Sequence, residues 1–547
     1  MRYAVTVLVL VGVAVAYVPS SFRWQSTAGL WEDDYDLLFE PARIPLIEGS
    51  RAYTALSNLV SHREEQFGTN TANVFLVGGS TDRLGPVYPG LVYDRTSYRA
   101  PLETGLYGHN EEPLFGTGKV IHTELLDLDS NGTYDYKRED VTEAMAWDDG
   151  GSADYYFGAA YQSGSLRAGL GFARADSSST VTDPDFNYTY DRRDSSLVDG
   201  RVLFTQTEAF DGDDRLSVSR NRFILGGWYD TEDWNVGLSG GFALMNETDA
   251  YTHRGQTLED RSPANPLIED YAVTELLDTM SLPYVGNMIS ATASAFYVPR
   301  EEVESRFYLT LYTQSQSVSD GGGLEFHYVD SVCHPGTAVG HDSTFHAYSG
   351  QRAAQGIGVR THQLLTLSEK FNLGFGAGFL IHAWGDSLSS ASRHRTRYSY
   401  DNGDTIAGSE DYVASVTYSS EWVDRTTGSA NVLSVPVGLE FKPWSPCALR
   451  LGALHQVTWS SVTRVEKLVA SSPRLTRVEY GNGSSYEYLG DAEETPGISE
   501  TTGTTKHTTE FSYGIGYSPI DHLQFDLMGF AKLTDLTGWK LSVTFKF

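Results

Sequence analysis

The sequence predicts an all-β fold, a transmembrane antiparallel β-barrel of about 14 strands, within a range of about 12 to 16. Three observations predict it. The chain ends in a segment of strictly alternating polarity, similar segments recur throughout residues 87–547, and the connections between them are alternately short and long. Alternation with a period of two is the pattern of a β-strand whose two faces meet different surroundings.

The last eleven residues show the alternation most clearly. Residues 537–547 read TGWKLSVTFKF, and the apolar positions are Trp539, Leu541, Val543, Phe545 and Phe547. The residues between them are polar, so one face of this strand is apolar and the other is polar. By itself the pattern fits an edge strand of a soluble sheet as well as the closing strand of a membrane barrel, whose apolar face meets lipid.

The connections between the recurring segments follow a two-sided rule. Tight turns such as Ser163-Gly164 and Ser518-Pro519 alternate with long polar stretches. The long stretches, which we expect to be extracellular loops, cover residues 99–153, 176–218, 247–287, 318–350, 385–428 and 462–506. Short periplasmic turns and long external loops are typical of outer-membrane barrels, whereas a soluble sandwich follows no such rule.

Aromatic residues gather near the two ends of the predicted strands. Those beside the short turns are Trp228, Tyr229, Trp234, Tyr297, Phe371, Trp444 and Tyr517, and those toward the other ends are Trp384, Trp422 and Trp459. Two aromatic belts are expected where a barrel crosses the two membrane interfaces. The alternative is that these side chains cap a soluble core.

The N-terminus has the three parts of a secretory signal. Arg2 supplies a positive charge, the segment from Ala4 to Val15 is apolar, and Ala14-Val15-Ala16 fits a cleavage site. We therefore expect residues 1–16 to be a signal peptide, with an N-terminal anchor helix as the alternative. No later apolar run is long enough for a spanning helix.

Residues 17–86 lack the alternation and are predicted to form an N-terminal plug or periplasmic segment, followed by the barrel at 87–547. Tyr53, Leu56 and Leu59 fall at helical spacing, which predicts a helix near residues 50–62. A small separate domain is the alternative. Glycines at predicted inward positions suggest that something approaches the wall closely, or that they relieve barrel curvature. They are Gly169, Gly171, Gly237, Gly241, Gly356, Gly358, Gly374, Gly376 and Gly378.

Together these features resemble a bacterial outer-membrane β-barrel over residues 87–547. The resemblance implies that the outer membrane of a diderm bacterium is the location, and that the barrel-assembly machinery reads the terminal Phe547. In addition, Phe39-Glu40-Pro41-Ala42 resembles the Asn-Pro-Ala element in the N-terminal hatch of FadL-like fatty-acid channels. Glu40 takes the place of the Asn, and the glycine-rich stretch that precedes this element in those channels is missing.

The charge of the chain excludes some partners. The sequence has 71 acidic and 40 basic residues, a formal net charge of −31, so nucleic acid is not expected to bind. The charged residues predicted to face the lumen have mixed signs, which argues against a strongly ion-selective pore. They include Arg222, Arg306, Arg360, Glu440, Arg450 and Asp526.

Two groups of residues have the chemistry of metal ligands. Asp127, Asp129, Asn131 and Asp135 alternate around Gly132 and suit a calcium loop, although Arg138 takes the place of the final Glu of an EF-hand. The alternative is a plain acidic turn. His327, His334, His341 and His346 suit zinc or copper but match no finger spacing. Cys333 and Cys447 are predicted at opposite membrane sides, so both should be free.

The predicted function is a channel or transporter for a small, partly apolar solute, with outer-membrane lipid around it. The alternative is a surface adhesion or structural barrel with a blocked lumen and partner-binding loops. No cofactor other than calcium is expected. The chain has no G-x-S-x-G element and no evident nucleophile and base pair, so we do not expect an enzyme.

Overall fold

The computed structural model describes residues 21–57, 73–107, 112–127, 132–182, 187–261, 270–333, 336–404, 410–492, 494–495, 497–528 and 539–547. Its helices are α2 (Phe22–Ser26), α3 (Asp34–Leu37) and the 3-10 helix η1 (Pro41–Leu46). No helix in these ranges is long and apolar enough to cross a membrane. The predicted signal peptide lies outside the described residues.

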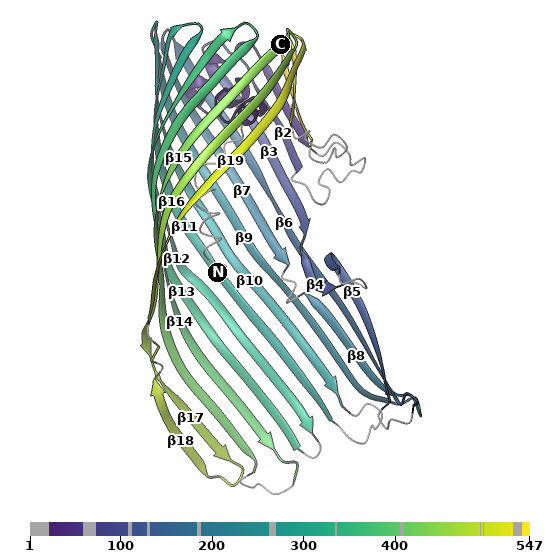
Figure 1. Cartoon of the computed structure of the whole chain (residues 1–547). Helices are drawn as coiled ribbons and strands as arrows, with labels where there is room; N and C mark the ends of the chain where they lie inside the picture. The colour runs from purple at the N-terminus through teal and green to yellow at the C-terminus, as the bar shows by residue number, and fades with distance from the viewer. Residues whose placement is uncertain are drawn as a thin grey trace.

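Most of the described chain is β-strand (Figure 1). The strands are β1 (Arg51–Ser57), β2 (Asn73–Ser80), β3 (Val87–Pro101), β4 (Glu103–Tyr107), β5 (Pro113–Leu126), β6 (Tyr136–Ser163), β7 (Leu166–Thr182), β8 (Tyr188–Ser196), β9 (Val202–Asp230), β10 (Trp234–Asp260), β11 (Asp270–Arg300), β12 (Val303–Cys333), β13 (Gly336–Ser368), β14 (Phe371–Asp401), β15 (Tyr412–Trp444), β16 (Cys447–Ser471), β17 (Pro473–Tyr480), β18 (Ser485–Ala492), β19 (Ile498–Ile520), β20 (Leu523–Met528) and β21 (Lys540–Lys546).

The strands form a closed antiparallel barrel of 16 strands, which confirms the predicted all-β antiparallel barrel and gives it two strands more than the predicted 14. The ring runs β1-β2-β3-β6-β7-β9, continues through β10 to β16, and passes through β19, β20 and β21 back to β1. The closing pair matches Arg51 with Lys546 at one end and Ser57 with Lys540 at the other. The remaining strands β4, β5, β8, β17 and β18 pair with the wall strands or with each other.

The first two wall strands lie in the segment that the sequence analysis assigned to the plug. Fourteen of the 16 wall strands begin at or after Val87, and β1 and β2 supply the other two. The helix predicted near residues 50–62 is therefore wrong over the described part, where Arg51–Ser57 is a strand. Tyr53 and Ala55 are buried on the inner face and Leu56 is exposed. Apolar residues on both faces hid the alternation of this strand.

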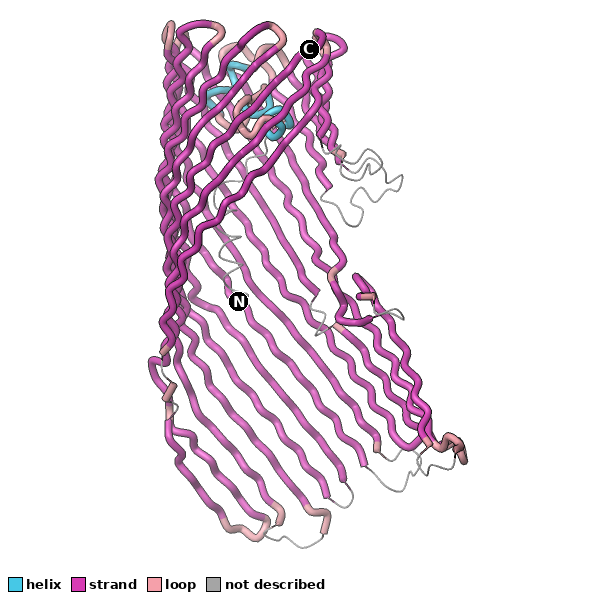
Figure 2. The backbone as a smooth tube through the Cα atoms, in the orientation of Figure 1, coloured by secondary structure: helices cyan, strands magenta, loops and turns pink. Residues whose placement is uncertain are grey.

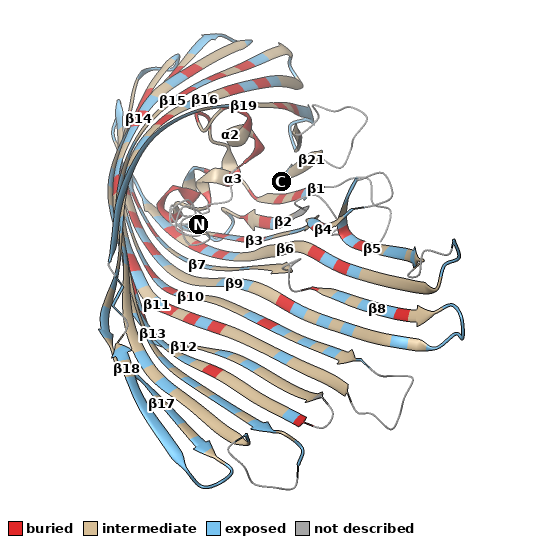
Figure 3. Cartoon of the chain, turned by 60° about the horizontal axis from the view of Figure 1, so that its bottom comes forward, coloured by how far each residue is buried: buried red, intermediate tan, exposed pale blue. Residues whose placement is uncertain are grey.

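The barrel is tall on one side and short on the other (Figure 1). Strands β10 to β15 have 27 to 33 residues each, whereas β1, β20 and β21 have 7, 6 and 7. Because a membrane strand needs only about 9–11 residues, the long strands continue far beyond the bilayer. Figure 3 shows that this extension is a curved, open sheet.

The six stretches predicted as extracellular loops are therefore mostly continued strands. The stretch 318–350, for example, forms the outer halves of β12 and β13. These segments are polar on both faces, so they lack the alternation of a half-buried strand. They remain strands because each pairs with its neighbours along nearly its whole length, and β-propensity depends on that context.

An apolar band surrounds the closed part of the barrel. Connections of two residues join β6 to β7, β11 to β12, β13 to β14, β15 to β16 and β19 to β20 at the end that holds the C-terminus. The band next to these turns includes exposed Leu170, Leu225, Leu238, Leu309, Val359, Phe379, Val437 and Leu451. A closed antiparallel barrel with such a band spans a membrane, and its short turns mark the periplasmic end.

Each of the two predicted aromatic belts includes a tryptophan that faces the inside of the barrel instead of the lipid. Tyr229, Trp234, Trp444 and Tyr517 are exposed beside the short turns, as expected for an interfacial belt. Trp228, however, is 4% exposed and packs inside the barrel. Its neighbour Tyr229 points outward, and adjacent strand residues cannot share a face. Trp384 also turns inward, where it stacks on the buried His382.

The closing strand allows a direct test of the membrane assignment. Val543 pairs with Thr54 on one side and Phe525 on the other, in the middle of β21. Val543→Arg should lower the free energy of unfolding in lipid by about 2–4 kcal/mol, because an arginine would meet hydrocarbon. Urea titration of the protein in lipid vesicles measures this change in the free energy of unfolding. Gln351→Arg, on the outer face of β13 beyond the apolar band, is the control and should change little; equal losses would contradict the assignment.

Candidate functional site

The lumen at the periplasmic end holds a compact segment, residues 21–50, which we call the insert (Figure 2). The Ser21 hydroxyl caps α2 by accepting a hydrogen bond from the backbone N–H of Trp24 at 3.0 Å. Asp33 and Asp36 form a capping box on α3. The backbone N–H and the hydroxyl of Ser21 donate to the Asp36 carboxylate at 2.7 and 2.6 Å. These bonds tie the two short helices into one unit.

Glycines in the wall let the insert approach closely. A Cβ atom on Gly169 would lie 2.4 Å from the carbonyl carbon of Pro41, and one on Gly438 would lie 2.8 Å from the Leu30 side chain. No larger residue fits at either position unless the insert moves. Other predicted inward glycines serve a different purpose, because wall side chains fill the space beside them: Trp228 at Gly237, Tyr312 at Gly356 and His362 at Gly376.

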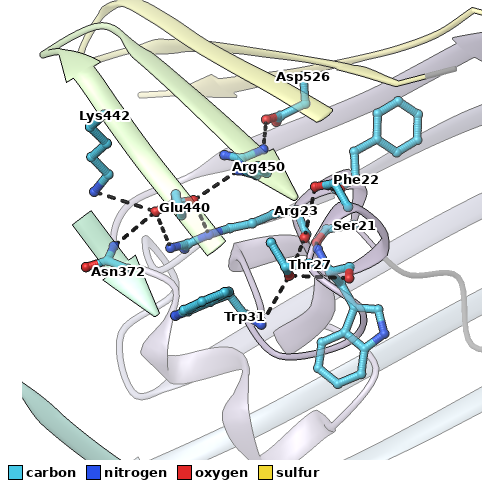
Figure 4. Close-up of polar contacts among 12 residues, drawn as sticks. Ser21, Phe22, Arg23, Thr27, Trp31, Asn372, Glu440, Lys442, Arg450 and Asp526 are labelled. Carbon is cyan, nitrogen blue, oxygen red and sulfur yellow. Dashed lines mark hydrogen bonds and ion pairs between the residues drawn. The ribbon is translucent and has the colours of Figure 1, made fainter. Parts of the chain in front are cut away.

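A cluster of buried charges joins the insert to β15, β16 and β20 (Figure 4). The Arg23 guanidinium donates to both oxygens of Glu440, Nε to Oε2 and Nη2 to Oε1, each at 3.1 Å. Arg450 Nε donates to the same carboxylate at 3.0 Å, and Arg450 also pairs with Asp526. Glu440 is 1% exposed, so its charge depends on these partners.

A second cluster joins the insert to β12. Glu32 accepts from Arg43, also in the insert, at 2.8 and 3.0 Å and from Arg306 at 2.8 Å. The Arg43 guanidinium lies 5.3 Å from the ring centre of Trp228 and 5.2 Å from that of Phe296. Burial raises the pKa of the Glu32 carboxyl, but Arg43 and Arg306 lower it more, so its pKa is below the usual value.

Five of the six charged residues predicted to face the lumen belong to these contacts. Arg306, Glu440, Arg450 and Asp526 are in the two clusters, and Arg360 lies 5.9 Å from the ring centre of Trp24 in the insert. A cavity of about 670 Å³ lies between the insert and the wall at the periplasmic end, and both clusters line it.

The sixth residue, Arg222, lines a separate inner pocket of about 320 Å³, which we call the Phe39 pocket. Phe39 of the insert is one wall, and the other apolar residues include Val92, Ala173, Val218 and Ile224. Its polar lining includes Asp94, Asp154, Tyr156, Arg220 and Arg222. The pocket therefore combines an apolar part with charges of both signs, and its shape depends on the position of the insert.

The charges on the insert side, Arg23, Glu32 and Arg43, were not predicted from the sequence as site residues. One feature of the sequence could have indicated these buried charges. Arg23 and Arg43 are the two basic residues of an otherwise acidic segment, residues 21–50, that lacks strand alternation. Isolated basic residues in such a segment indicate buried pairing, but the partner at position 440 or 306 is visible only in the fold.

The predicted metal ligands are only partly placed. Asp129, Asn131 and His334 lie outside the described residues, and within the described ranges no three potential ligands gather around one point. His346 pairs with Glu325 at 3.4 Å on the inner face, whereas His341 stands at an odd position of β13 and faces outward. Alternation along the strand separates them. Cys447 is a free thiol.

Phe547 is held at the closing seam. Its backbone N–H donates to the carbonyl of Ser50 at 3.0 Å, and the Ser50 N–H donates to the carbonyl of Phe547 at 3.0 Å. The Phe547 side chain is exposed.

Comparisons with known proteins agree only at the level of architecture. No family model and no curated protein matches the chain. Among solved structures, the toluene transporter TbuX of Ralstonia pickettii is similar at 10% identity over 82% of this chain and 97% of that one, with a TM-score of 0.23. A Pseudomonas aeruginosa FadL homologue is similar at 9% identity, covering 97% and 99%, with a TM-score of 0.24. The ferric yersiniabactin uptake receptor FyuA of Yersinia pestis follows at 9%, covering 91% and 80%, with a TM-score of 0.26. Likeness at these scores carries no argument about function.

The architecture itself decides the location. A closed antiparallel barrel with an apolar outer band and short turns at one end is the form that spans the bacterial outer membrane. This protein is an outer-membrane β-barrel of a diderm bacterium.

The Arg23–Glu440–Arg450 cluster yields a stability prediction. Glu440→Gln removes the carboxylate shared by the buried Arg450 and the partly buried Arg23, and it should lower the free energy of unfolding by about 3–5 kcal/mol. It should also make the insert more sensitive to protease. Lys442→Gln is the matched control, because Lys442 is exposed and lies 3.7 Å from the same carboxylate. The control should change stability by less than about 1 kcal/mol. Equal effects of both substitutions would contradict the assigned role of Glu440.

Proposed function

We propose that this protein is a non-catalytic outer-membrane transporter that admits a small, partly apolar solute, and that the insert is the plug that gates its lumen. Outer-membrane lipid surrounds the apolar band in this proposal, and Phe547 is the residue read by the assembly machinery. The architecture supports a barrel transporter in general, and the contacts of the insert and the Phe39 pocket support the gating and the solute class.

One observation carries the proposal. Apart from its last residue, Ser50, which pairs with Phe547, the insert is held by side-chain contacts, chiefly the clusters around Glu440 and Glu32, rather than by strand pairing with the wall. Such contacts can break and reform without opening the barrel, which suits a movable plug. The insert also supplies Phe39 to the Phe39 pocket, so a movement of the plug would change the shape of the place where a solute rests.

The properties of the Phe39 pocket support the solute class. Its volume of about 320 Å³ is at the lower end of small-molecule sites. Val92, Ala173 and Ile224 offer apolar contact, and Arg220 and Arg222 each have a buried Nε without a hydrogen-bond partner among the described residues. A molecule with an apolar body and a polar group would satisfy both kinds of surface.

Removing the insert separates a gated transporter from a blocked scaffold. Deletion of residues 22–48 leaves β1 intact and should give a large, steady ion conductance in planar bilayers, because the insert would no longer fill the periplasmic end of the lumen. The wild-type protein should show small or rare openings. A deletion variant that stays closed would favour the alternative function, a surface adhesion or structural barrel with a blocked lumen.

A reversible lock tests whether the insert must move. The Cβ of Ala42 lies 3.3 Å from the ideal Cβ position of Gly226, close to the spacing of a disulfide. Ala42→Cys with Gly226→Cys, in a background without Cys333 and Cys447, should lose solute uptake into liposomes when oxidised and regain it with reductant. The two single cysteine variants are the controls. Uptake that persists through the oxidised lock would contradict the gating role.

We also propose that the loop after β5 binds calcium through Asp127 and Asp135, together with Asp129 and Asn131. The Gly132 N–H donates to Asp127 Oδ2 at 2.7 Å, and the Asp135 N–H donates to the Leu126 carbonyl at 2.9 Å. These bonds hold both ends of the acidic loop together. Gly132 has φ +87°, a conformation that favours glycine.

Calorimetry tests the calcium site directly. Titration of the intact protein should show one site with a Kd of about 0.1–1 mM, the range of extracellular modules. Asp127→Asn with Asp135→Asn should abolish it. Asp148→Asn with Asp149→Asn removes the same charge from β6 and should leave calcium binding unchanged. Loss of binding in both double variants would point to general charge screening instead.

A further inference from the structure

A row of three arginines runs along the outer face of the extracellular extension. Arg393, Arg395 and Arg397 occupy alternate positions of β14 and are all exposed. They share the outward face with Phe375 and Ile381 of the apolar band, since the register of β14 with both neighbours continues without a shift from there to the row. Side chains at alternate positions of a strand stand about 7 Å apart, so the row is about 13 Å long.

The row lacks acidic partners, although the chain has a net charge of −31. Within the part of the chain that the structure describes, none of these arginines forms an ion pair. Other exposed arginines of the extension do: Arg464 pairs with Asp424 at 2.7 Å and Arg477 with Glu479 at 2.6 Å.

The residues opposite the row are small or neutral. On β13 they are Phe345, Ser343 and His341, and on β15 they are Ser419, Thr417 and Ser415. The nearest carboxylate of the adjacent strand belongs to Glu421, which stands opposite Ala391 at the end of the row and accepts a hydrogen bond from the Ser389 hydroxyl at 3.5 Å. The guanidinium groups therefore remain available to an outside anion.

A groove accompanies the row. Its volume is about 690 Å³, and its lining includes Arg393, Arg395, Phe345 and Ser419, the carboxyl residue Glu421, and Ser472 beyond the end of β16. Phe345 is 55% exposed beside Arg393. An open ring next to guanidinium groups suits an acidic sugar, whose C–H face can pack on the ring while its acidic group pairs with arginine.

The height of the row excludes lipid headgroups as the anion. The last large apolar side chain on the outer face of β14 before the row is Ile381, and Arg393 follows twelve residues later. At about 3.3 Å per residue this is about 40 Å along the strand. Even on a tilted strand, the row stands well outside the bilayer surface, where the extended molecules are polysaccharide chains.

We propose that the Arg393–Arg395–Arg397 row and the Phe345 groove bind an anionic polysaccharide of the cell surface. The acidic surface of the rest of the extension repels such a polymer, so it is confined to the row. This site lies outside the lumen, and it holds whether or not the barrel is a transporter.

Binding to model polymers tests the proposal with the full-length protein in detergent. Wild type should bind dextran sulfate and polygalacturonate, and neutral dextran should not bind. Replacing all three arginines of the row by Gln should weaken both interactions at least tenfold and flatten the salt dependence of binding. Phe345→Ala should weaken polygalacturonate binding with the salt dependence unchanged.

The matched control replaces three exposed arginines that already have acidic partners. Arg201→Gln, Arg215→Gln and Arg261→Gln remove the same charge from residues paired with Asp199, Asp213 and Glu259. This variant should bind both polymers as wild type does. Equal loss in the control, no binding by wild type, or binding of poly-glutamate but of neither acidic polysaccharide would overturn the proposal, the last in favour of an acidic protein partner.

Discussion

The pairing of β1 with β21 is the interaction on which the rest of this structure depends. In hydrocarbon an unpaired backbone N–H or C=O group costs several kcal/mol, so an open sheet edge is excluded there. The seven-residue register from Arg51–Lys546 to Ser57–Lys540 removes that edge. The Phe547 and Ser50 hydrogen bonds continue it to the periplasmic rim. The chain can leave the sheet open further out because water satisfies the backbone groups beyond the membrane.

Closure of the barrel also buries charged side chains in the lumen, and the insert supplies their partners of opposite charge. Glu440, Arg450 and Asp526 are turned into a lumen where burial makes single charges costly. Arg23 completes that set, and Glu32 with Arg43 does the same for Arg306. The insert and the wall thus neutralise each other across contacts that involve no strand pairing. Such a joint is specific in the docked state and still separable, which is the physical basis of the gating proposal.

The outer face of the extracellular extension carries different residue types from the outer face of the membrane part. In the apolar band the outer face is restricted to residues such as Leu238 and Phe379, because lipid is the neighbour. Further along the same strands both faces meet water, so the outer face carries residues chosen for other contacts. The unpaired row at Arg393 lies in this region, where the fold does not require it. The proposed binding of an anionic polysaccharide explains why the three arginines stand at these positions.

The sequence by itself determined that the chain forms a membrane barrel, which end of the barrel is periplasmic, and which side chains face the lumen. Period-two alternation from Val87 onward predicted about 14 strands, and the structure has fourteen of its 16 wall strands there; the short turns identified the periplasmic end. These are local properties, since each strand must suit lipid on one face wherever it lies in the ring. The same reasoning placed charges such as Arg306 and Glu440 on the inner face, because inward and outward positions alternate.

Only the tertiary structure decided what those inward residues meet. The pairing of Arg23 with Glu440 joins positions 417 apart, and nothing in local sequence specifies it. β1 was not predicted because its inner face packs under the insert through Tyr53 while its outer face meets lipid. Both faces therefore carry apolar residues, and the strand lacks the alternation of apolar and polar positions. The long polar stretches became strands through pairing with neighbours rather than through their own pattern. Contacts of this kind exist only after the ring has closed, which is why the sequence determined the wall and the fold decided the site.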